Sequence, residues 1–508
     1  MRLKQDKFFI SIKWLLLKAL ILAPFFSMTQ LQQYGRLEIP ISNNNERFEV
    51  SSAKEYGLVL HRRMTSRSGD FIELIHTDSS LLELWHGELP VEKNLVIGNQ
   101  TIVEEHFYLI LHDERLSDRN FQLYRVNLRT KDYVKFSVRN SIPFFPTMLE
   151  VNTQGALIGG YYNRVPLVLF FQFDIQKSKI LPGLFNETGE LAQLKVNPDA
   201  TFDLLICARN YQKQKTIWLK HYDALGKLED NIMLIPDDNN HLIFGRLIQT
   251  NDNARIVAGV FGNKNGEYSK GLFIATLDEG GVRQIKYYNF GELANFFNYM
   301  RDKQEFRIKK KIERKRIRGK KLRFQYRFLV HELVPSGNQY IMLGEAFYKR
   351  YKNPPVSPLM TSAYNTERIF DGYHYTHAAV LGIDFQGNLI WDNSFEMNDV
   401  RTFSLEQYVK MDVQDDSIAL LYLSDNKLQT KIIRNNNVVE GKTFNELDVK
   451  SNEKGSAETQ STTTKLDYWY KGYFLTYGIQ NTFSPSSQGS RRKKVYFITK
   501  VGYPKARP

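Results

Sequence analysis

The residue types best suited to chemistry lie together in the segment FDGYHYTH. Two histidines and an aspartate, His374, His377 and Asp371, occur there within seven residues. Neutral imidazoles and a carboxylate are usual ligands of zinc, but side chains three residues apart on a β-strand point to opposite sides of the sheet. We therefore expect no metal here, and no metal-dependent change in His374→Ala or His377→Ala variants.

Two other interpretations apply to the same segment. Its aromatic rings can pack an insertion onto the rest of the protein, or four of its residues can line a ligand pocket. The candidate pocket residues are Tyr373, His374, Tyr375 and His377. We favour packing, and the sequence identifies no catalytic residue.

A run of basic residues is the strongest local signal in the chain. Residues 301–328 hold fourteen Lys or Arg against three Asp or Glu, a net charge of +11 in a chain that carries +14. Residues 1–30 carry a net charge of +4, so the rest of the protein is nearly neutral. Like charges at this density repel one another unless solvent or anionic groups surround them.

The basic run predicts a docking element for an anionic partner. Its candidate contact residues are Lys309, Lys310, Lys311, Arg314, Lys315, Arg316, Arg318, Lys320 and Lys321. An acidic protein surface is the favoured partner, with anionic lipid head groups as the alternative. Nucleic acid is disfavoured because residues 307–323 interleave no aromatic side chain with the cations. The remaining alternative is a solvated insertion without a partner, whose apolar side chains only pack on the rest of the protein.

The basic residues are expected to lie on an amphipathic helix over 291–318. Leu293, Phe296, Phe297 and Met300 recur at the spacings of one helix face. Gly319 is expected to end the helix.

Five aspartates follow apolar strands and resemble a set of repeated catalytic carboxylates. They are Asp78, Asp174, Asp223, Asp278 and Asp384. Each precedes a short polar turn, where an Asp side chain bonds the backbone that follows it, so we expect turn residues. We find no nucleophile elbow, phosphate loop or zinc-binding helix motif in the chain, and we expect no cofactor.

A repeated unit positions these residues. Seven copies of an apolar strand, an Asp or Asn, a polar turn and a second strand follow one another at steps of about 47 to 55 residues, except one step of 106. This spacing is typical of a four-stranded sheet repeated around an axis. An eighth set near the C-terminus has three strands, and Tyr34–Ile41 forms a strand that belongs to no complete repeat.

The sequence therefore predicts an all-β protein, a β-propeller of eight four-stranded blades over 34–503 that the N-terminal strand closes. Seven blades is the alternative. If the blades are numbered from the repeat that begins near residue 46, a basic helical insertion at 291–324 falls between blades five and six. A loop insertion at 349–375 is expected on the same face, and 447–461 is expected to be a flexible linker.

The first thirty residues are predicted to be an export signal. Arg2, Lys4 and Lys7 precede an apolar run that two lysines interrupt, and this run is shorter than the roughly 20 residues that span a bilayer. An uncleaved N-terminal anchor is the alternative. The one cysteine, Cys207, excludes an internal disulfide, and its apolar surroundings predict a buried thiol.

Two resemblances follow from these motifs. The hairpin lines IDFQGNLIW and HYDALGKLED resemble the repeats of eight-bladed quinoprotein-like propellers, which include dehydrogenases and non-enzymatic scaffolds. The blade tryptophan of quinoproteins recurs only at Trp85 and Trp391, and the cysteines of both groups are absent. The stretch from RFLVHELV to LIWDNSFEMND resembles an uncharacterised exported propeller family of Gram-negative envelopes, which implies the periplasm or the outer-membrane periphery.

Two functions remain open. The favoured one is a non-enzymatic scaffold of the periplasm or outer membrane that binds another envelope protein through its insertion face. The alternative is an exported enzyme that acts on a glycan or small alcohol in the central channel.

Overall fold

We describe the protein from a computed structural model. The described residues are 31–67, 69–115, 119–184, 188–237, 240–249, 254–263, 266–278, 281–320, 322, 324–352, 368–414, 417–424, 427–434, 437–446, 457–486 and 489–503. The predicted export signal lies outside them. Among the described residues, no helix has the length and apolar character needed to cross a bilayer.

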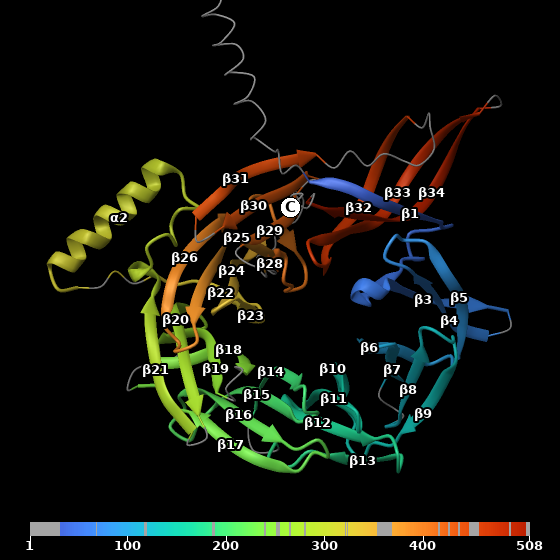
Figure 1. The fold of residues 1–508 in the computed structure, drawn as a ribbon, viewed down its shortest axis with the longest axis horizontal. Coiled ribbons are helices and arrows are strands. Elements are labelled where there is room, and N and C mark those ends of the chain that lie inside the picture. The colour runs from blue at the N-terminus through green and yellow to red at the C-terminus, as the bar shows by residue number, and fades with distance from the viewer. Residues whose placement is uncertain are drawn as a thin grey trace, which may run out of the picture.

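Eight antiparallel sheets surround one axis, as Figure 1 shows. We count the sheet that contains the first strand as blade 1. Blade 1 holds β1 (Gln32–Pro40), β32 (Ala457–Tyr470), β33 (Tyr473–Ser486) and β34 (Gly489–Gly502). Blade 2 holds β2 (Glu49–Ser52), η1 (Lys54–Tyr56), β3 (Leu58–Ser66), β4 (Gly69–Thr77) and β5 (Glu83–Val91).

The next four blades follow the chain in order. Blade 3 holds β6 (Leu95–Val103), β7 (His106–Asp113), β8 (Phe121–Asn127) and β9 (Tyr133–Val138). Blade 4 holds β10 (Phe145–Val151), β11 (Gly155–Tyr162), β12 (Val165–Gln172) and β13 (Lys177–Ile180). Blade 5 holds β14 (Gly189–Val196), β15 (Phe202–Arg209), β16 (Lys215–Tyr222) and β17 (Leu228–Leu234). Blade 6 holds β18 (Asn240–Gln249), β19 (Arg255–Asn263), β20 (Ser269–Asp278) and β21 (Gly281–Asn289).

The last two blades follow the insertion that contains η2 (Phe290–Glu292) and α2 (Asp302–Ile317). Blade 7 holds β22 (Arg327–Val330), β24 (Gln339–Lys352), β25 (Ile369–Asp384) and β26 (Leu389–Glu396), with short β23 (Val334–Ser336) and β27 (Arg401–Thr402) at its edges. Blade 8 holds β28 (Lys410–Gln414), β29 (Ser417–Ser424), β30 (Lys427–Arg434) and β31 (Asn437–Glu446). The eight-blade prediction is confirmed, and the seven-blade alternative is wrong.

The N-terminal strand closes the ring, as predicted. β1 pairs with β34 in antiparallel register, with Leu37 opposite Ile498 and Ile39 opposite Tyr496. Leu37 and Ile39 pack against the apolar cluster between blades 1 and 2. The first and last segments of the chain therefore complete one sheet, and β1 covers the edge that β34 would otherwise expose.

The blades pack through apolar side chains between neighbouring sheets. Leu74 of blade 2 and Phe107 of blade 3, for example, share one buried cluster. Cys207 is buried with a free thiol, as predicted, and burial raises its pKa to about 12. The thiol is therefore protonated and unreactive at neutral pH.

Three of the five strand-end aspartates are confirmed as turn residues. Asp78 Oδ1 accepts hydrogen bonds from the backbone N–H groups of Ser80 and Leu82, both at 2.8 Å. The Oδ1 atoms of Asp223 and Asp384 accept from the backbone N–H groups of their own turns in the same way. These carboxylates hold hairpins and take no part in a shared site.

The helix differs from the prediction in position and in extent. In the count used here it follows blade 6 and does not lie between blades five and six, because the sheet that contains β1 precedes the repeats counted from residue 46. The helix α2 begins at Asp302, so Leu293, Phe296 and Phe297 are buried but not helical. The helix ends at Ile317, and Gly319 follows in the left-handed region with φ +63°.

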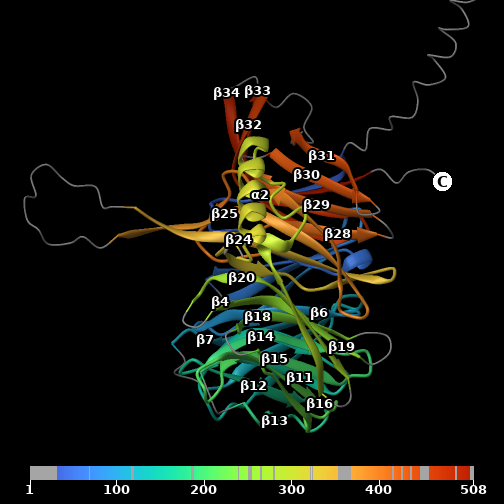
Figure 2. The same ribbon diagram turned by 90° about the vertical axis from the view of Figure 1, so that its left-hand side faces the viewer.

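The second insertion is a hairpin and not a loop where it is described. Residues 349–352 belong to β24 and residues 369–375 belong to β25, which pair with each other; residues 353–367 lie outside the described residues. Figure 2 shows this hairpin projecting from one side of the ring while α2 lies along the rim. Of the predicted linker 447–461, the part from Ala457 belongs to β32 and the rest is not described.

Candidate functional site

A buried aspartate anchors the insertion that leads into α2. Asp392 on β26 accepts hydrogen bonds from the backbone N–H groups of Ala294 at 2.9 Å and Asn295 at 2.7 Å. The Asn295 side-chain amide donates back to the Asp392 carbonyl at 3.0 Å. These bonds hold the segment before α2 against β26, and its apolar side chains are buried there without forming a helix. Burial raises the pKa of Asp392.

An aromatic cage around His377 forms the second anchor. The imidazole is fully buried and stacks on the Tyr299 ring, with centroids 3.8 Å apart and planes 3° from parallel. Phe296 and Tyr326 meet the imidazole edge-on at 5.0 Å and 5.3 Å. His377 is therefore a packing residue between β25 and the insertion.

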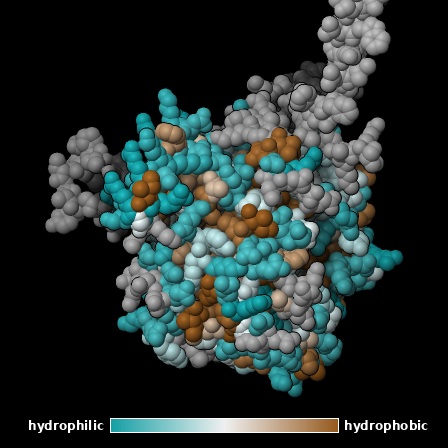
Figure 3. Space-filling view, turned by 60° about the vertical axis from the view of Figure 1, so that its left-hand side comes forward, coloured by the Kyte–Doolittle hydropathy of each residue, from teal (hydrophilic) through white to brown (hydrophobic). Residues whose placement is uncertain are grey.

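The helix α2 contacts the ring along one narrow face. Ile308 and Ile312 pack against the apolar cluster of blades 6 and 7. Away from the ring, Phe306 is 66% exposed and Ile317 is 76% exposed. Figure 3 shows the side of the molecule from which α2 protrudes as mostly hydrophilic, with separate hydrophobic patches.

Most of the predicted contact residues lie on the exposed surface of this insertion. The exposed ones are Lys309, Lys310, Lys311, Arg314, Arg316, Arg318 and Lys320. Lys315 is half-buried on the ring side, and Lys321 lies outside the described residues. Among the described cations of α2, only Lys309 and Arg316 have a carboxylate within 4 Å, from Glu305 and Glu313.

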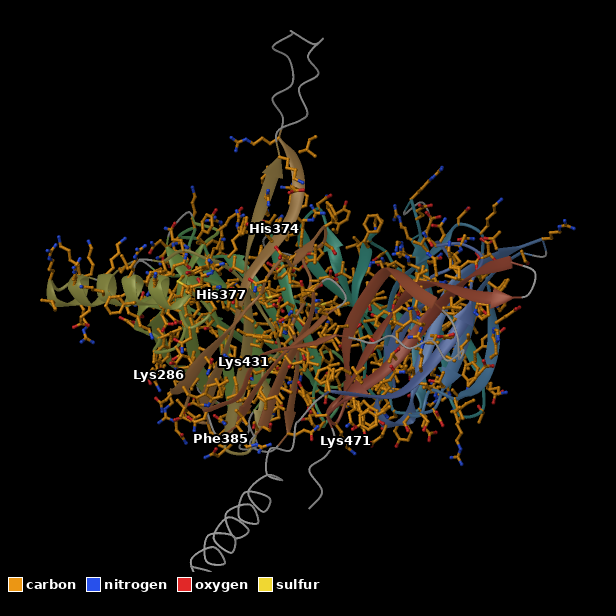
Figure 4. The ribbon with its side chains drawn as sticks, turned by 90° about the horizontal axis from the view of Figure 1, so that it is seen from above. Lys286, His374, His377, Phe385, Lys431 and Lys471 are labelled. Carbon is orange, nitrogen blue, oxygen red and sulfur yellow. The ribbon has the colours of Figure 1, made fainter. Side chains whose placement is uncertain are left out.

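The predicted pocket residues separate into two groups. His374 and Tyr375 line a cavity of about 620 Å³ between the start of α2 and the β24–β25 hairpin, which Arg301 and Arg350 also line. Tyr373 instead packs on Phe347 in the apolar core, and His377 lies in the aromatic cage. Figure 4 shows His374 farther out along the projecting hairpin than His377.

The geometric argument against a metal needs correction. A β-bulge leaves Thr376 as an extra residue between the pairs Phe347–Tyr375 and Ala346–His377, so simple alternation does not hold across it. The Asp371 carboxylate instead meets the cations of Lys352 at 2.7 Å, Arg401 at 3.0 Å and Arg350 at 3.4 Å. The hydrogen bond from Lys352 is the main cause that lowers the pKa of Asp371. No group of three or more His, Cys, Asp or Glu in the described part of the chain is placed to hold a metal ion.

A second cluster lies at the inner edges of blades 4, 6 and 7, around the axis of the ring. Glu150 on β10 is half-buried, and Glu332, between β22 and β23, is close enough to interact with its charge. Burial, helped by the Glu332 charge, raises the pKa of Glu150 to about 7. The Arg246 guanidinium on β18 donates to the carbonyl oxygens of Ala192 at 2.5 Å and Val330 at 3.4 Å.

The axial cluster opens onto two adjoining cavities. Arg246 and Glu332 line one of about 390 Å³, and a neighbouring cavity of about 520 Å³ shares Gln407, Lys410 and Asp467 with it. The sequence did not predict this cluster, because its members come from different blades and no local spacing connects them. Their shared place at the inner edge of a blade is the one signal that a blade-by-blade alignment of the repeats would have given.

We expect Glu150 to make stability depend on pH in a definite direction. Its carboxyl has a pKa of about 7 in the folded protein against an ordinary 4.5, so its stabilising contribution is full below pH 4.5 and is lost as the pH rises toward 7. Relative to wild type, Glu150→Gln should therefore gain about 2 kcal/mol of unfolding free energy between pH 4.5 and 8, after allowance for solvent screening. Urea unfolding at both pH values measures this gain. The exposed Glu88→Gln is the control, and parallel pH curves for wild type and Glu150→Gln would contradict the expectation.

No family model and no curated protein matches this chain. Among solved structures, the chain is similar to polysaccharide lyase Uly1, with 10% identity over 80% of this chain and 89% of that chain and a TM-score of 0.40. It is also similar to the β-propeller domain of the Trilobed protease from Pyrococcus furiosus, with 9% identity over 79% of this chain and 95% of that one and a TM-score of 0.34. An ulvan lyase matches with 8% identity over 78% of this chain and 95% of its own, at a TM-score of 0.39. These neighbours are β-propellers of low identity, and the likeness concerns the fold alone.

Proposed function

We propose that this propeller is a binding protein that docks an acidic surface of another protein through α2. The observation that carries the proposal is the unbalanced charge of a helix that stands on the rim of the ring. Residues 302–317 contain eight Lys or Arg and three Asp or Glu, and most of these cations face solvent without a carboxylate from the described residues. An acidic partner would supply the missing counter-charges.

The anchoring of the insertion supports a docking role. Asp392 and His377 fix the segment before α2 to blade 7, so the helix leaves the ring from a defined place. A preorganised element loses less entropy on binding than a flexible arm. Phe306 and Ile317, exposed among the cations, can supply the apolar contacts that give such an interface its stability.

The cellular setting is part of the proposal. The predicted export signal and the resemblance to an exported propeller family support a place in the periplasm or at the outer-membrane periphery. The partner is then another envelope protein. An acidic protein is favoured over anionic lipid because the exposed apolar side chains of α2 are few and isolated, whereas interfacial membrane helices bury a broad apolar face.

A charge-neutralised variant tests the proposal. Lys309, Lys310, Lys311, Arg314, Lys315 and Arg316 are each replaced by Gln, and the purified protein is used to recover partners from envelope extract at several salt concentrations. Wild type should recover an acidic protein at low salt and release it as salt rises, because screening weakens exposed charge pairs. The variant should recover at least tenfold less, with a flatter salt dependence, and should unfold at the same temperature.

A matched control separates local charge from net charge. Six exposed cations on the blades, Arg129, Arg139, Lys177, Lys213, Lys227 and Arg283, are replaced by Gln in a second variant. This variant loses the same net charge and should recover the partner like wild type. Equal recovery by both variants and wild type would mean that α2 is only a solvated helix without a docking role. Binding of anionic vesicles, with no protein recovered, would mean that the partner is anionic lipid and not a protein.

A second candidate function is an enzyme that acts on a glycan in the axial channel. The observation that favours it is the pair Glu150 and Glu332, in which one carboxyl has its pKa raised to about 7 beside another carboxylate. General acid–base pairs in glycan cleavage take this form. This second function would be established if wild type and the charge-neutralised variant turn over a glycan and Glu150→Gln does not.

A further inference from the structure

A cleft separates the C-terminal end of α2 from the strand ends of blade 6. Its volume is about 650 Å³, and its lining includes Lys270, Lys315, Lys320 and Tyr287. We call it the anion cleft. A cavity of this size is typical of a site for a small molecule. Two of the predicted contact residues, Lys315 and Lys320, line it.

Blade 6 supplies one fixed cation. The Lys270 ammonium donates to Asn240 Oδ1 at 2.7 Å and to Asn263 Oδ1 at 3.0 Å, and it lies 5.0 Å from the centre of the Phe261 ring. These contacts hold the charge in place at the wall of the cleft. A held cation loses little conformational entropy when an anion arrives.

Tyr287 supplies a neutral donor beside that cation. Its hydroxyl oxygen accepts a hydrogen bond from the Asp237 backbone N–H at 3.2 Å. Burial raises the pKa of Tyr287, so the phenol keeps its proton at neutral pH. A phenol oxygen that accepts a hydrogen bond can still donate its own hydrogen to a ligand.

The helix supplies two further cations. The half-buried residues of α2 are spaced three or four apart, on one face of the helix: Glu305, Ile308, Ile312 and Lys315. Lys315 therefore lies on the face that packs against the ring. The chain then turns at Gly319, and the Lys320 N–H donates to the Lys315 carbonyl at 2.9 Å. This turn brings the second lysine back to the same cleft.

The anion cleft therefore collects positive charge at its lining. Its lining contains three lysines and no Asp or Glu. Among the described residues, no carboxylate lies within 4 Å of the Lys315 or Lys320 amine, since the ion pairs of this segment belong to Lys309, Arg316 and Arg327. Three ammonium groups around one cleft repel one another, and a bound anion would relieve that repulsion.

We infer that the anion cleft binds a tetrahedral oxyanion, phosphate or sulfate, carried as an ester on a sugar-sized molecule. Lysine amines and the Tyr287 hydroxyl are suitable donors for its oxygens, because charge-assisted hydrogen bonds to such oxygens are short and strong. The volume supports an ester over the free ion, since a free phosphate would leave most of the cleft empty. The inference does not depend on the docking proposal.

Isothermal titration calorimetry on the full chain tests the site with defined probes. The probes are inorganic phosphate, inorganic sulfate, glucose 6-phosphate and, as a neutral reference, glucose. We expect glucose 6-phosphate to bind more tightly than phosphate, and glucose not to bind. Equal affinities for the ester and the free ion would overturn the ester assignment and leave a site for the free anion.

Paired substitutions locate the binding. The double variant Lys315→Gln/Lys320→Gln should lose about tenfold or more in affinity, while Lys309→Gln/Lys310→Gln on the exposed side should bind like wild type. Thermal unfolding checks that both variants fold. Absence of phosphate and glucose 6-phosphate binding in wild type, or equal losses in both variants, would overturn the site.

Discussion

Removal of residues 34–41 is expected to abolish soluble, cooperative folding. This deletion takes away most of β1, exposes the length of β34 as an open edge, and uncovers the apolar cluster between blades 1 and 2. The lost burial of Leu37, Ile39 and Ile41 alone costs roughly 5 kcal/mol. An open edge in addition offers a template for pairing with other copies.

Several side-chain contacts add to the effect of that seam. Arg36 on β1 donates to Thr499 Oγ1 at 3.1 Å and to the Gln480 side chain, and its guanidinium lies 4.7 Å from the Phe497 ring centre. These bonds join β1 to β33 and β34. They disappear together with the strand.

Soluble yield and the thermal unfolding midpoint measure the result. A milder variant, Ile39→Asp, places one charge against the same cluster and should lower the midpoint in the same direction. Gln33→Ala at the exposed end of β1 should leave it unchanged. A deletion variant as soluble and as stable as the undeleted chain would show that β1 does not close the ring.

The substitution His377→Ala is expected to cost about 3 kcal/mol of unfolding free energy. It removes a fully buried ring from between Tyr299, Phe296 and Tyr326 and leaves a cavity in the aromatic cage. The loss should also loosen the insertion, because His377 joins β25 to the segment before α2. Hydrogen exchange of residues 290–300 would report that loosening.

The control variant His377→Phe keeps the ring and removes the buried nitrogens. It should be at least as stable as wild type at neutral pH, because apolar packing replaces a polar group that burial penalises. Burial also lowers the pKa of His377 to about 3 against an ordinary 6.5. The contribution of His377 is therefore full above pH 6.5 and is lost as the pH falls toward 3, whereas His377→Phe should lack this loss. Equal stability of His377→Ala and wild type would contradict the assigned packing role.

Local patterns in the chain were sufficient to predict the ring. Each blade is built from neighbouring strands, so the alternation of apolar residues and the turn aspartates such as Asp78 reveal it directly. Closure by residues 34–41 was also predictable, because a three-strand final set and one orphan strand complete each other. The sequence analysis counted five blades before α2 and the structure has six. The difference arises because the sheet that contains β1 is counted as blade 1.

The departures from the sequence prediction have tertiary causes. The spacing of Leu293, Phe296 and Phe297 fits a helix, but these side chains are buried in the cluster of blades 6 and 7 in another conformation. The Asp392 carboxylate, about 100 residues away, holds the segment there through two of its backbone amides. The alternation rule failed at His374 and His377 because a bulge inserts one residue between them. Glu150, Arg246 and Glu332 lie on different blades, so only the closed ring brings them near each other.

A site-specific photo-cross-link tests the central claim most directly, because it reports contact and not recovery. A photoreactive residue replaces Phe306, which is 66% exposed on α2, or Tyr56, which is 62% exposed on η1 at another part of the ring. After irradiation in intact cells, position 306 should yield one predominant product with an acidic envelope protein, and the product should disappear when the six α2 cations are neutralised. Position 56 should not yield it. The same product from both positions, or no product from position 306, would contradict docking through α2.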